Sequence, residues 1–229
     1  MSVRAAARLP RPVTHVVFDL DGVLLDTEGF YTRVTQEIVG RYGKVYDWSI
    51  KGHMLGRPAT DAARYLVHTL ALPITPEDFL IERDLLLAEL FPESLPMPGA
   101  RELTAALAAR GVGQAVATST TREGVVLKTG RHRDWFRLFD AIIAGDDPRV
   151  GCGKPAPDIF LVAAEALGVA PAHCVVVEDA PAGIVAAHAA GMQVIAVRDP
   201  GMDPARLADA ELVVGSLAEL TPGDLGFPG

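Results

Sequence analysis

Short apolar, β-branched runs alternate with helical patterns along this chain, and the alternation limits the possible folds more than any other feature of the sequence. The candidate strands share the length and apolar character of strands buried in a parallel sheet. They cover residues 13–18, 113–117, 141–144, 174–177 and 194–197. Helical patterns that each end at a glycine lie between them, at 100–110, 158–167 and 182–190. The alternation predicts an α/β fold, a Rossmann-like doubly wound parallel sheet whose ligand site lies beyond the carboxyl ends of the strands.

Residues 27–96 interrupt this alternation. They contain helical patterns at 31–42, 60–70 and 76–90 and no convincing buried strand. Two prolines and a glycine in 94–99 stop any helix where the chain would return to the sheet. We therefore expect a catalytic core of residues 1–26 and 97–229, with a helical cap of residues 27–96 inserted after the first strand.

Charge and composition exclude several classes of partner. The net charge is −8 without a basic stripe, so neither nucleic acid nor an anionic membrane surface is expected to bind. No apolar stretch reaches the roughly 18 residues of a membrane span. Two cysteines, Cys152 and Cys174, fit neither a disulfide framework nor a zinc spacing. We expect a soluble cytoplasmic monomer; its arginine-bearing start, 1–12, fits a frayed tail or, alternatively, a weak mitochondrial presequence.

The first candidate strand ends in two aspartates, Asp19 and Asp21, followed by Gly22. Two carboxylates so close together are costly beside a buried strand unless a cation binds them. One carboxylate can attack phosphorus while the other transfers protons, which divides phosphate hydrolysis into two in-line steps. Taken alone, Asp-x-Asp-Gly also fits a plain turn, because Asp and Gly are common turn residues.

Three further motifs follow later strands. Thr118 and Ser119 open a run of hydroxyls and free N–H groups suited to a phosphoryl group, although such a run also caps ordinary helices. Lys154 lies between a glycine and a proline, which fixes an ammonium where it can neutralise phosphate. Glu178 and Asp179 end a buried strand and offer metal carboxylates, or, in the simpler interpretation, an N-cap. All four motifs at strand ends of one sheet favour a joint functional site.

This combination resembles the four motifs of the haloacid dehalogenase superfamily, in the subfamily with a helical cap after the first motif, and the resemblance covers nearly the whole chain. It implies Asp19 as nucleophile and metal ligand, and Asp21 as general acid and base with its carbonyl on the metal. Thr118, the Ser119 amide and Lys154 would hold the phosphoryl group. Asp179 and Glu178 would complete a site for Mg²⁺, which prefers such hard oxygen donors.

The stretches around the motifs resemble pseudouridine-5′-phosphatases most closely, and glycerol- and sugar-phosphate phosphatases share part of the pattern. The resemblance therefore implies a small phosphorylated metabolite as substrate, with pseudouridine 5′-phosphate as the first choice. A sugar phosphomutase is the alternative enzyme. Similar mutases carry an arginine near the position where this chain has Ala59, and this difference favours the phosphatase. A non-catalytic metabolite-binding protein on the same fold is the alternative from another class.

Two cap residues, His53 and Arg57, fall where similar enzymes place a loop over the site, so either is a candidate for substrate contact. Both also fit solvated surface positions. Tyr46 and Trp48 can stack on a base, but their side chains also suit packing within the cap. The substrate specificity of the chain is expected to depend on this region.

Overall fold

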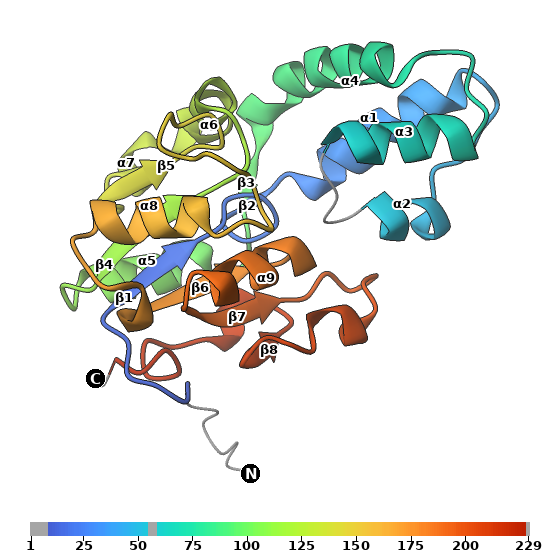
Figure 1. The fold of residues 1–229 in the computed structure, drawn as a ribbon. Helices are drawn as coiled ribbons and strands as arrows, with labels where there is room; N and C mark the ends of the chain where they lie inside the picture. The colour runs from blue at the N-terminus through green and yellow to red at the C-terminus, as the bar shows by residue number, and fades with distance from the viewer. Residues whose placement is uncertain (1–8, 55–58, 228–229) are drawn as a thin grey trace, which may run out of the picture.

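The computed structural model describes residues 9–54 and 59–227. Within these residues six parallel strands form the main sheet, in the order β5–β4–β1–β6–β7–β8 (Figure 1). The strands are β1 (His15–Phe18), β4 (Gly113–Ala117), β5 (Ala141–Ile143), β6 (Cys174–Glu178), β7 (Gln193–Val197) and β8 (Leu212–Val214). The parallel α/β sheet predicted from the sequence is confirmed. Only β8 among these strands, at the edge of the sheet, is absent from the prediction.

Helices connect the strands on both sides of the sheet. They are α5 (Ala100–Ala108), α6 (Arg122–Thr129), α7 (Arg133–Phe136), α8 (Asp158–Ala166) and α9 (Pro181–Ala189). Short 3-10 segments are η1 (Phe91–Glu93), η2 (Gly130–His132), η3 (Pro171–His173), η4 (Pro204–Leu207) and η5 (Leu217–Glu219). Gly111, Gly168 and Gly191 follow α5, α8 and α9 with φ of 69°, 67° and 80°, the left-handed conformation that ends a helix. No helix in the described ranges is long and apolar enough to span a membrane.

Both faces of the sheet are buried, which explains why its strands read as continuous apolar runs. Successive side chains of β1 point to opposite faces. Val16 and Phe18 belong to one hydrophobic cluster, which includes Leu103 and Leu107 of α5. Val17 belongs to the other cluster, which α8 and α9 cover. The polar residues that follow the strands therefore lie at the edge of two fully packed layers.

Four helices form a lobe beside the carboxyl end of the sheet (Figure 1). They are α1 (Glu28–Gly40), α2 (Trp48–Met54), α3 (Ala59–Thr69) and α4 (Pro76–Leu90). The lobe has its own hydrophobic cluster, centred on Ile38, Leu66 and Phe79, each fully buried. The prediction gives α1, α3 and α4 but not α2, whose seven residues are too short for a clear helical period.

Two short segments join this lobe to the sheet. β2 (Leu25–Asp26) and β3 (Leu95–Pro96) pair antiparallel, so the chain enters and leaves the lobe side by side. Neither segment was expected, since two-residue strands leave no pattern in a sequence. The division into a core of 1–26 and 97–229 and a cap of 27–96 remains a proposal, and the lobe of α1 to α4 lies inside the interval assigned to the cap.

Candidate active site

The carboxyl end of β1 is the switch point of the sheet, because β4 pairs with one side of β1 and β6 with the other. Parallel sheets form a crevice at such a point. Asp19 directly follows β1, Thr118 follows β4, and Glu178 and Asp179 lie at the end of β6. Lys154 reaches the same place from the loop between β5 and α8. The fold thus brings all four predicted motifs to one edge of the sheet.

Lys154 links two of the carboxylates. Its Nζ donates to Asp19 Oδ1, to Glu178 Oε1 at 2.7 Å and to the Ala117 carbonyl at 3.1 Å. The side chain is almost fully buried, and Nζ lies 4.9 Å from the centre of the Phe160 ring. Burial alone would lower the pKa of Lys154, but the charges of Asp19 and Glu178 raise it above its ordinary value. The ammonium therefore stays charged beside the candidate nucleophile.

Glu178 is turned into the protein. Its Oε2 accepts hydrogen bonds from the N–H groups of Asp179 at 2.9 Å and Ala180 at 2.8 Å, while Oε1 faces Lys154. A Cβ added at Gly183, in α9, would collide with this carboxylate. The glycine leaves the space that Glu178 needs. Because both oxygens already have protein donors, the geometry gives Glu178 the task of holding Lys154, and its assignment as a metal ligand stays a prediction.

Asp179 lies against the turn that carries the two aspartates. A Cβ added at Gly22 would collide with the Asp179 carboxylate, and Gly22 also has a φ of 76°. Both facts require glycine at this position. Burial raises the pKa of Asp179 well above its ordinary value, and the charges of Glu178 and Asp19 act in the same direction. Asp179, which is partly buried, and Asp19, which is buried, are therefore neighbouring carboxylates.

Burial also raises the pKa of Asp19, to about 7, with Lys154 opposing the shift and the carboxylates of Glu178 and Asp21 adding to it. The N–H of Asp21 donates to Asp19 Oδ2 at 2.9 Å, which fixes the carboxylate over the turn. A single lysine thus does not balance the negative charge at this edge of the sheet.

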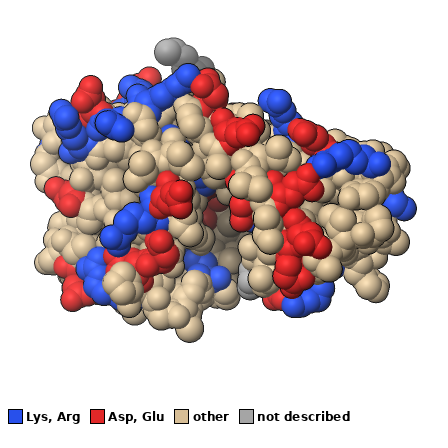
Figure 2. Space-filling view, turned by 90° about the horizontal axis from the view of Figure 1, so that it is seen from above, with Lys and Arg blue, Asp and Glu red and all other residues tan. Residues whose placement is uncertain are grey.

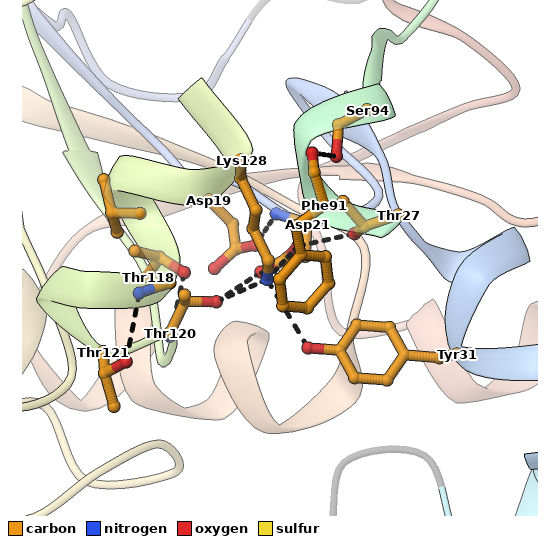
Figure 3. Close-up of polar contacts among 12 residues, drawn as sticks. Asp19, Asp21, Thr27, Tyr31, Phe91, Ser94, Thr118, Thr120, Thr121 and Lys128 are labelled. Carbon is orange, nitrogen blue, oxygen red and sulfur yellow. Dashed lines mark hydrogen bonds and ion pairs between the residues drawn. The ribbon is translucent and has the colours of Figure 1, made fainter. Parts of the chain in front are cut away.

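Asp21 has a different environment, shown in Figure 3. Its Oδ1 accepts from the Thr27 hydroxyl at 2.5 Å and from Lys128 Nζ at 2.7 Å. Its Oδ2 accepts from the Thr120 hydroxyl at 2.7 Å and from the same Nζ at 2.9 Å. Burial would raise the pKa of Asp21, but the charge and hydrogen bonds of Lys128, with those of the two threonines, lower it.

Thr118 is buried, and its Oγ1 accepts from the N–H of Thr120 at 3.1 Å, which leaves the hydroxyl proton free to be donated. Ser119 is exposed at the tip of the same loop. A Cβ at Gly145 would collide with the Ser119 carbonyl, so the loop after β5 supports this tip closely. The N–H of Gly145 donates to the Thr120 carbonyl at 2.9 Å. The loop is therefore held rigidly beside Asp19.

The structure says less about the cap residues that are candidates for substrate contact. Arg57 lies outside the described residues, so its role stays a prediction. His53 is exposed and stacks on Tyr65, with ring centres 5.5 Å apart. Trp48 packs against Gly201, where a Cβ would collide with its ring. His53 and Trp48 line a cavity of about 570 Å³ between α2 and the segment 201–206. Figure 2 shows a hollow between the helical lobe and the rest of the molecule, with acidic side chains beside it.

Sequence reasoning missed four residues that surround Asp21. These are Thr27, Tyr31, Thr120 and Lys128. Lys128 is separated from Asp21 by 107 positions and occupies the last turn of α6, where a lysine ordinarily faces solvent. The one available signal was the hydroxyl run after β4, which includes Thr120 and was interpreted as a phosphate-binding loop or a helix cap.

The carboxylates also bear on the predicted Mg²⁺ site. Within 9–54 and 59–227, no group of three or more His, Cys, Asp or Glu side chains is arranged to hold a metal ion. Mg²⁺ commonly binds through one or two carboxylates and completes its shell with water and substrate phosphate. Asp19 and Asp179 supply two such oxygen donors, and the missing Cβ of Gly22 leaves room for the Asp179 carboxylate. The residues present thus fit Mg²⁺ through two carboxylates rather than the three of the predicted set.

A family model described as haloacid dehalogenase-like hydrolase matches residues 13–191. The chain belongs to this family. It is 44% identical over 221 residues to (DL)-glycerol-3-phosphatase 2 of Arabidopsis thaliana, covering 94% of this chain and 92% of that protein. It is 42% identical over 226 residues to the "Probable pseudouridine-5'-phosphatase" of Drosophila melanogaster, covering 97% and 98%.

A solved structure of a haloacid dehalogenase family hydrolase from Deinococcus radiodurans, with bound phosphate and sodium, has the same fold. Its TM-score is 0.74 at 30% identity, and the match covers 93% of this chain and 95% of that chain. Family and relatives together confirm two predictions made from the sequence. The superfamily was identified correctly, and this haloacid dehalogenase-like hydrolase is a phosphatase.

Proposed function

We propose that this phosphatase hydrolyses small phosphate monoesters with Mg²⁺, through an acyl phosphate formed on Asp19. The observation that carries the proposal is the position of Asp19 at the switch point, with the Lys154 ammonium on one carboxylate oxygen and the Asp21 N–H on the other. Lys154 fixes the carboxylate and neutralises charge that develops on the phosphoryl oxygens. Asp21, two residues later, provides the second functional carboxyl group.

In the first step an oxygen of Asp19 attacks phosphorus, and the bond from phosphorus to the leaving oxygen breaks. Asp21, which this step requires in its protonated form although its surroundings lower its pKa, donates this proton to that oxygen, which leaves as an alcohol. In the second step Asp21 accepts a proton from water, whose oxygen attacks phosphorus. The bond between phosphorus and Asp19 then breaks, releasing phosphate and restoring both carboxyl groups.

Asp19, Asp179 and the Asp21 carbonyl would hold the Mg²⁺ ion, which supplies positive charge that offsets the repulsion between the nucleophile and the phosphate. The Thr118 hydroxyl and the Ser119 N–H would bind phosphoryl oxygens, since both lie on the loop that the segment around Gly145 supports. Glu178 orients Lys154 through the 2.7 Å contact. Each of these residues then has one task in the same site.

For the leaving group, pseudouridine 5′-phosphate is the first candidate and glycerol 3-phosphate the second. The first is supported by the stretches around the motifs and by the Drosophila relative. The second is supported by the Arabidopsis relative, which is as similar to this chain. We propose that the lobe of α1 to α4 makes the choice, because among the core residues described above only Asp21 is assigned to the leaving group, and there only to its reacting oxygen. Both cysteines of the chain are free, which fits the expected cytoplasmic location. The cytoplasmic monomer stays a prediction.

The test of the chemistry is an assay with p-nitrophenyl phosphate, with Mg²⁺ and with a chelator. The wild-type protein should release p-nitrophenolate only with Mg²⁺, and mass spectrometry after an acid quench should find phosphate on Asp19. Asp19→Asn should stop turnover while the protein stays folded. Undiminished Mg²⁺-dependent hydrolysis by this variant would eliminate Asp19 as the nucleophile.

A panel of phosphate monoesters tests the substrate. Pseudouridine 5′-phosphate should give the highest kcat/KM, followed by glycerol 3-phosphate and then hexose 6-phosphates. If a polyol or sugar phosphate exceeds the nucleotide tenfold, the nucleotide assignment is wrong and the chemistry on Asp19 is unaffected. A hexose bisphosphate added to the same panel would reveal a mutase through the appearance of an isomerised monophosphate.

A further inference from the structure

Lys128 is a buried cation to which the scheme above gives no task. Its side chain has no exposed surface, although it belongs to the last turn of a helix only eight residues long. Removing an ammonium group from water costs several kcal/mol unless its charge and its donors are satisfied. The contacts of Lys128 must therefore compensate for that cost.

These contacts converge on Asp21. The Nζ of Lys128 lies 2.7 Å and 2.9 Å from the two oxygens of the Asp21 carboxylate, and 2.8 Å from Oγ1 of Thr120. It lies 3.4 Å from the hydroxyl of Tyr31. A lysine has three N–H donors, and this set occupies all of them. Thr120 in turn donates to Asp21, so the lysine and the threonine clamp the same carboxylate.

Aromatic rings complete the surroundings of the ammonium. The centre of the Phe91 ring lies 4.3 Å from Nζ, and that of the Tyr31 ring lies 5.5 Å away. The two rings also touch each other, with centres 5.9 Å apart. A cation held over aromatic faces away from water is stabilised by the negative faces of the rings. The two rings thus help to bury the ammonium, whose side chain has no exposed surface.

The same residues lie where the helical lobe meets the core. Tyr31 belongs to α1, Phe91 begins η1 after α4, and Leu127, the neighbour of Lys128, packs against the hydrophobic cluster of the lobe. Figure 3 shows the Lys128 ammonium beside Asp21 and Thr120, with the rings of Phe91 and Tyr31 next to it. The position of the carboxylate is consequently tied to the packing of the lobe on the core.

We propose that Lys128 is a positioning residue, which holds the carboxylate of Asp21 in one orientation for both proton transfers and links that orientation to the lobe through Tyr31 and Phe91. The inference rests on the proposed role of Asp21. With four hydrogen bonds from three side chains, the carboxylate has one arrangement in which its oxygens are satisfied. Without Lys128 it keeps only the two threonine hydroxyls, and its reach to the leaving oxygen becomes variable.

A double-mutant cycle tests this role. Lys128→Met keeps the length of the side chain and removes the charge, and we expect it to lower kcat about 100-fold, within the range of general acid–base catalysis. In the Asp21→Ala background the same change should lower kcat less than threefold, since no carboxylate remains to be positioned. In single turnovers, Lys128→Met should release about one equivalent of p-nitrophenolate rapidly and phosphate slowly, because p-nitrophenolate leaves without a proton while water attack needs Asp21.

The control is Lys51→Met. Lys51 is also buried and paired, with Glu28 at 3.1 Å, but it has no contact with Asp21 among those described. The factor by which Lys51→Met changes kcat should be the same with and without the Asp21 carboxylate. Thr120→Val, which removes the bridging hydroxyl and keeps the shape, gives a second test if Lys128→Met does not fold. It should lower kcat about tenfold, and only when Asp21 is present.

Binding of beryllium fluoride separates this proposal from the one it rests on. The wild-type protein and Lys128→Met should both bind it at Asp19 with Mg²⁺, since neither Asp19 nor Asp179 contacts Lys128. If wild-type protein neither binds it nor turns over, the proposed function has failed. If wild-type protein does both, but Lys128→Met and Thr120→Val lower kcat equally with and without Asp21, Lys128 has no positioning role.

Discussion

Asp19→Asn should make the metal-free protein more stable at neutral pH, although it removes the proposed nucleophile. Burial raises the pKa of Asp19 from its ordinary value of 3.8 to about 7, so the folded protein holds this proton more tightly than the unfolded chain does. The stability that this provides is complete below pH 4 and is lost as pH rises through 7. Asparagine cannot ionise, so the variant does not lose stability in this way as the pH rises.

The magnitude follows from the same shift. At about 1.36 kcal/mol per pH unit, the displacement of the Asp19 pKa corresponds to about 4 kcal/mol above pH 7. Against this, asparagine keeps one oxygen and replaces the other with an NH₂ group. One of the two bonds, from Lys154 or from the Asp21 N–H, is therefore lost, and the buried donor left without an acceptor costs about 2 kcal/mol. The net gain is about 2 kcal/mol, or a rise in Tm of about 4–8 °C for a domain of this size.

Thermal unfolding in a chelator, at pH 5, 6, 7 and 8, measures the difference. The Tm of Asp19→Asn should exceed that of the wild type at pH 8, and the gap should shrink towards pH 5, where the wild-type carboxyl is protonated. Added Mg²⁺ should raise the wild-type Tm more than that of the variant. Asp26→Asn, at an exposed position in β2, is the matched control and should show no such trend. A gap that does not change with pH, or a less stable variant at pH 8, would refute this account of the site.

Three further predictions concern other residues. Gly22→Ala should remove Mg²⁺-dependent turnover, because its Cβ would displace the Asp179 carboxylate; calorimetry should show lost Mg²⁺ binding. Mg²⁺ should bind the wild type more weakly as pH falls below 7, since protons and metal compete for Asp19, and titrations at pH 6 and 8 check this. Thr75→Ala should lower stability by about 1 kcal/mol, seen in denaturant unfolding, with kcat unchanged, since it breaks the capping box with Asp78 at the start of α4.

The parallel sheet could be predicted because buried strands and glycine-terminated helices leave long, regular patterns. The four motifs could be placed at one edge because the carboxyl ends of parallel strands share that edge. Asp19, Lys154, Glu178 and Asp179 accordingly meet where the sequence indicated. What a spacing cannot give is the direction in which a side chain turns. Glu178 turns to Lys154 and to the N–H groups of Asp179 and Ala180, just before α9.

The surroundings of Asp21 were not predictable in the same way. Lys128 and Thr27 reach Asp21 from α6 and from the residue before α1, and Tyr31 reaches Lys128 from α1. No local pattern marks any of them. Their contacts depend on how the lobe packs on the core, which is a property of the tertiary structure. The residues that no motif reveals are those that lie between the two parts of the molecule.

The antiparallel pair of β2 and β3 has a consequence for how such a protein can change. Since the two crossings lie side by side, the ends of the inserted chain are already close together, and closing the gap with a short turn would require little rearrangement of the sheet. Insertions between adjacent ends are tolerated because the host fold does not depend on their length. Different helical inserts could then be exchanged at this point during evolution, giving new leaving-group preferences to an unaltered phosphate-transferring core.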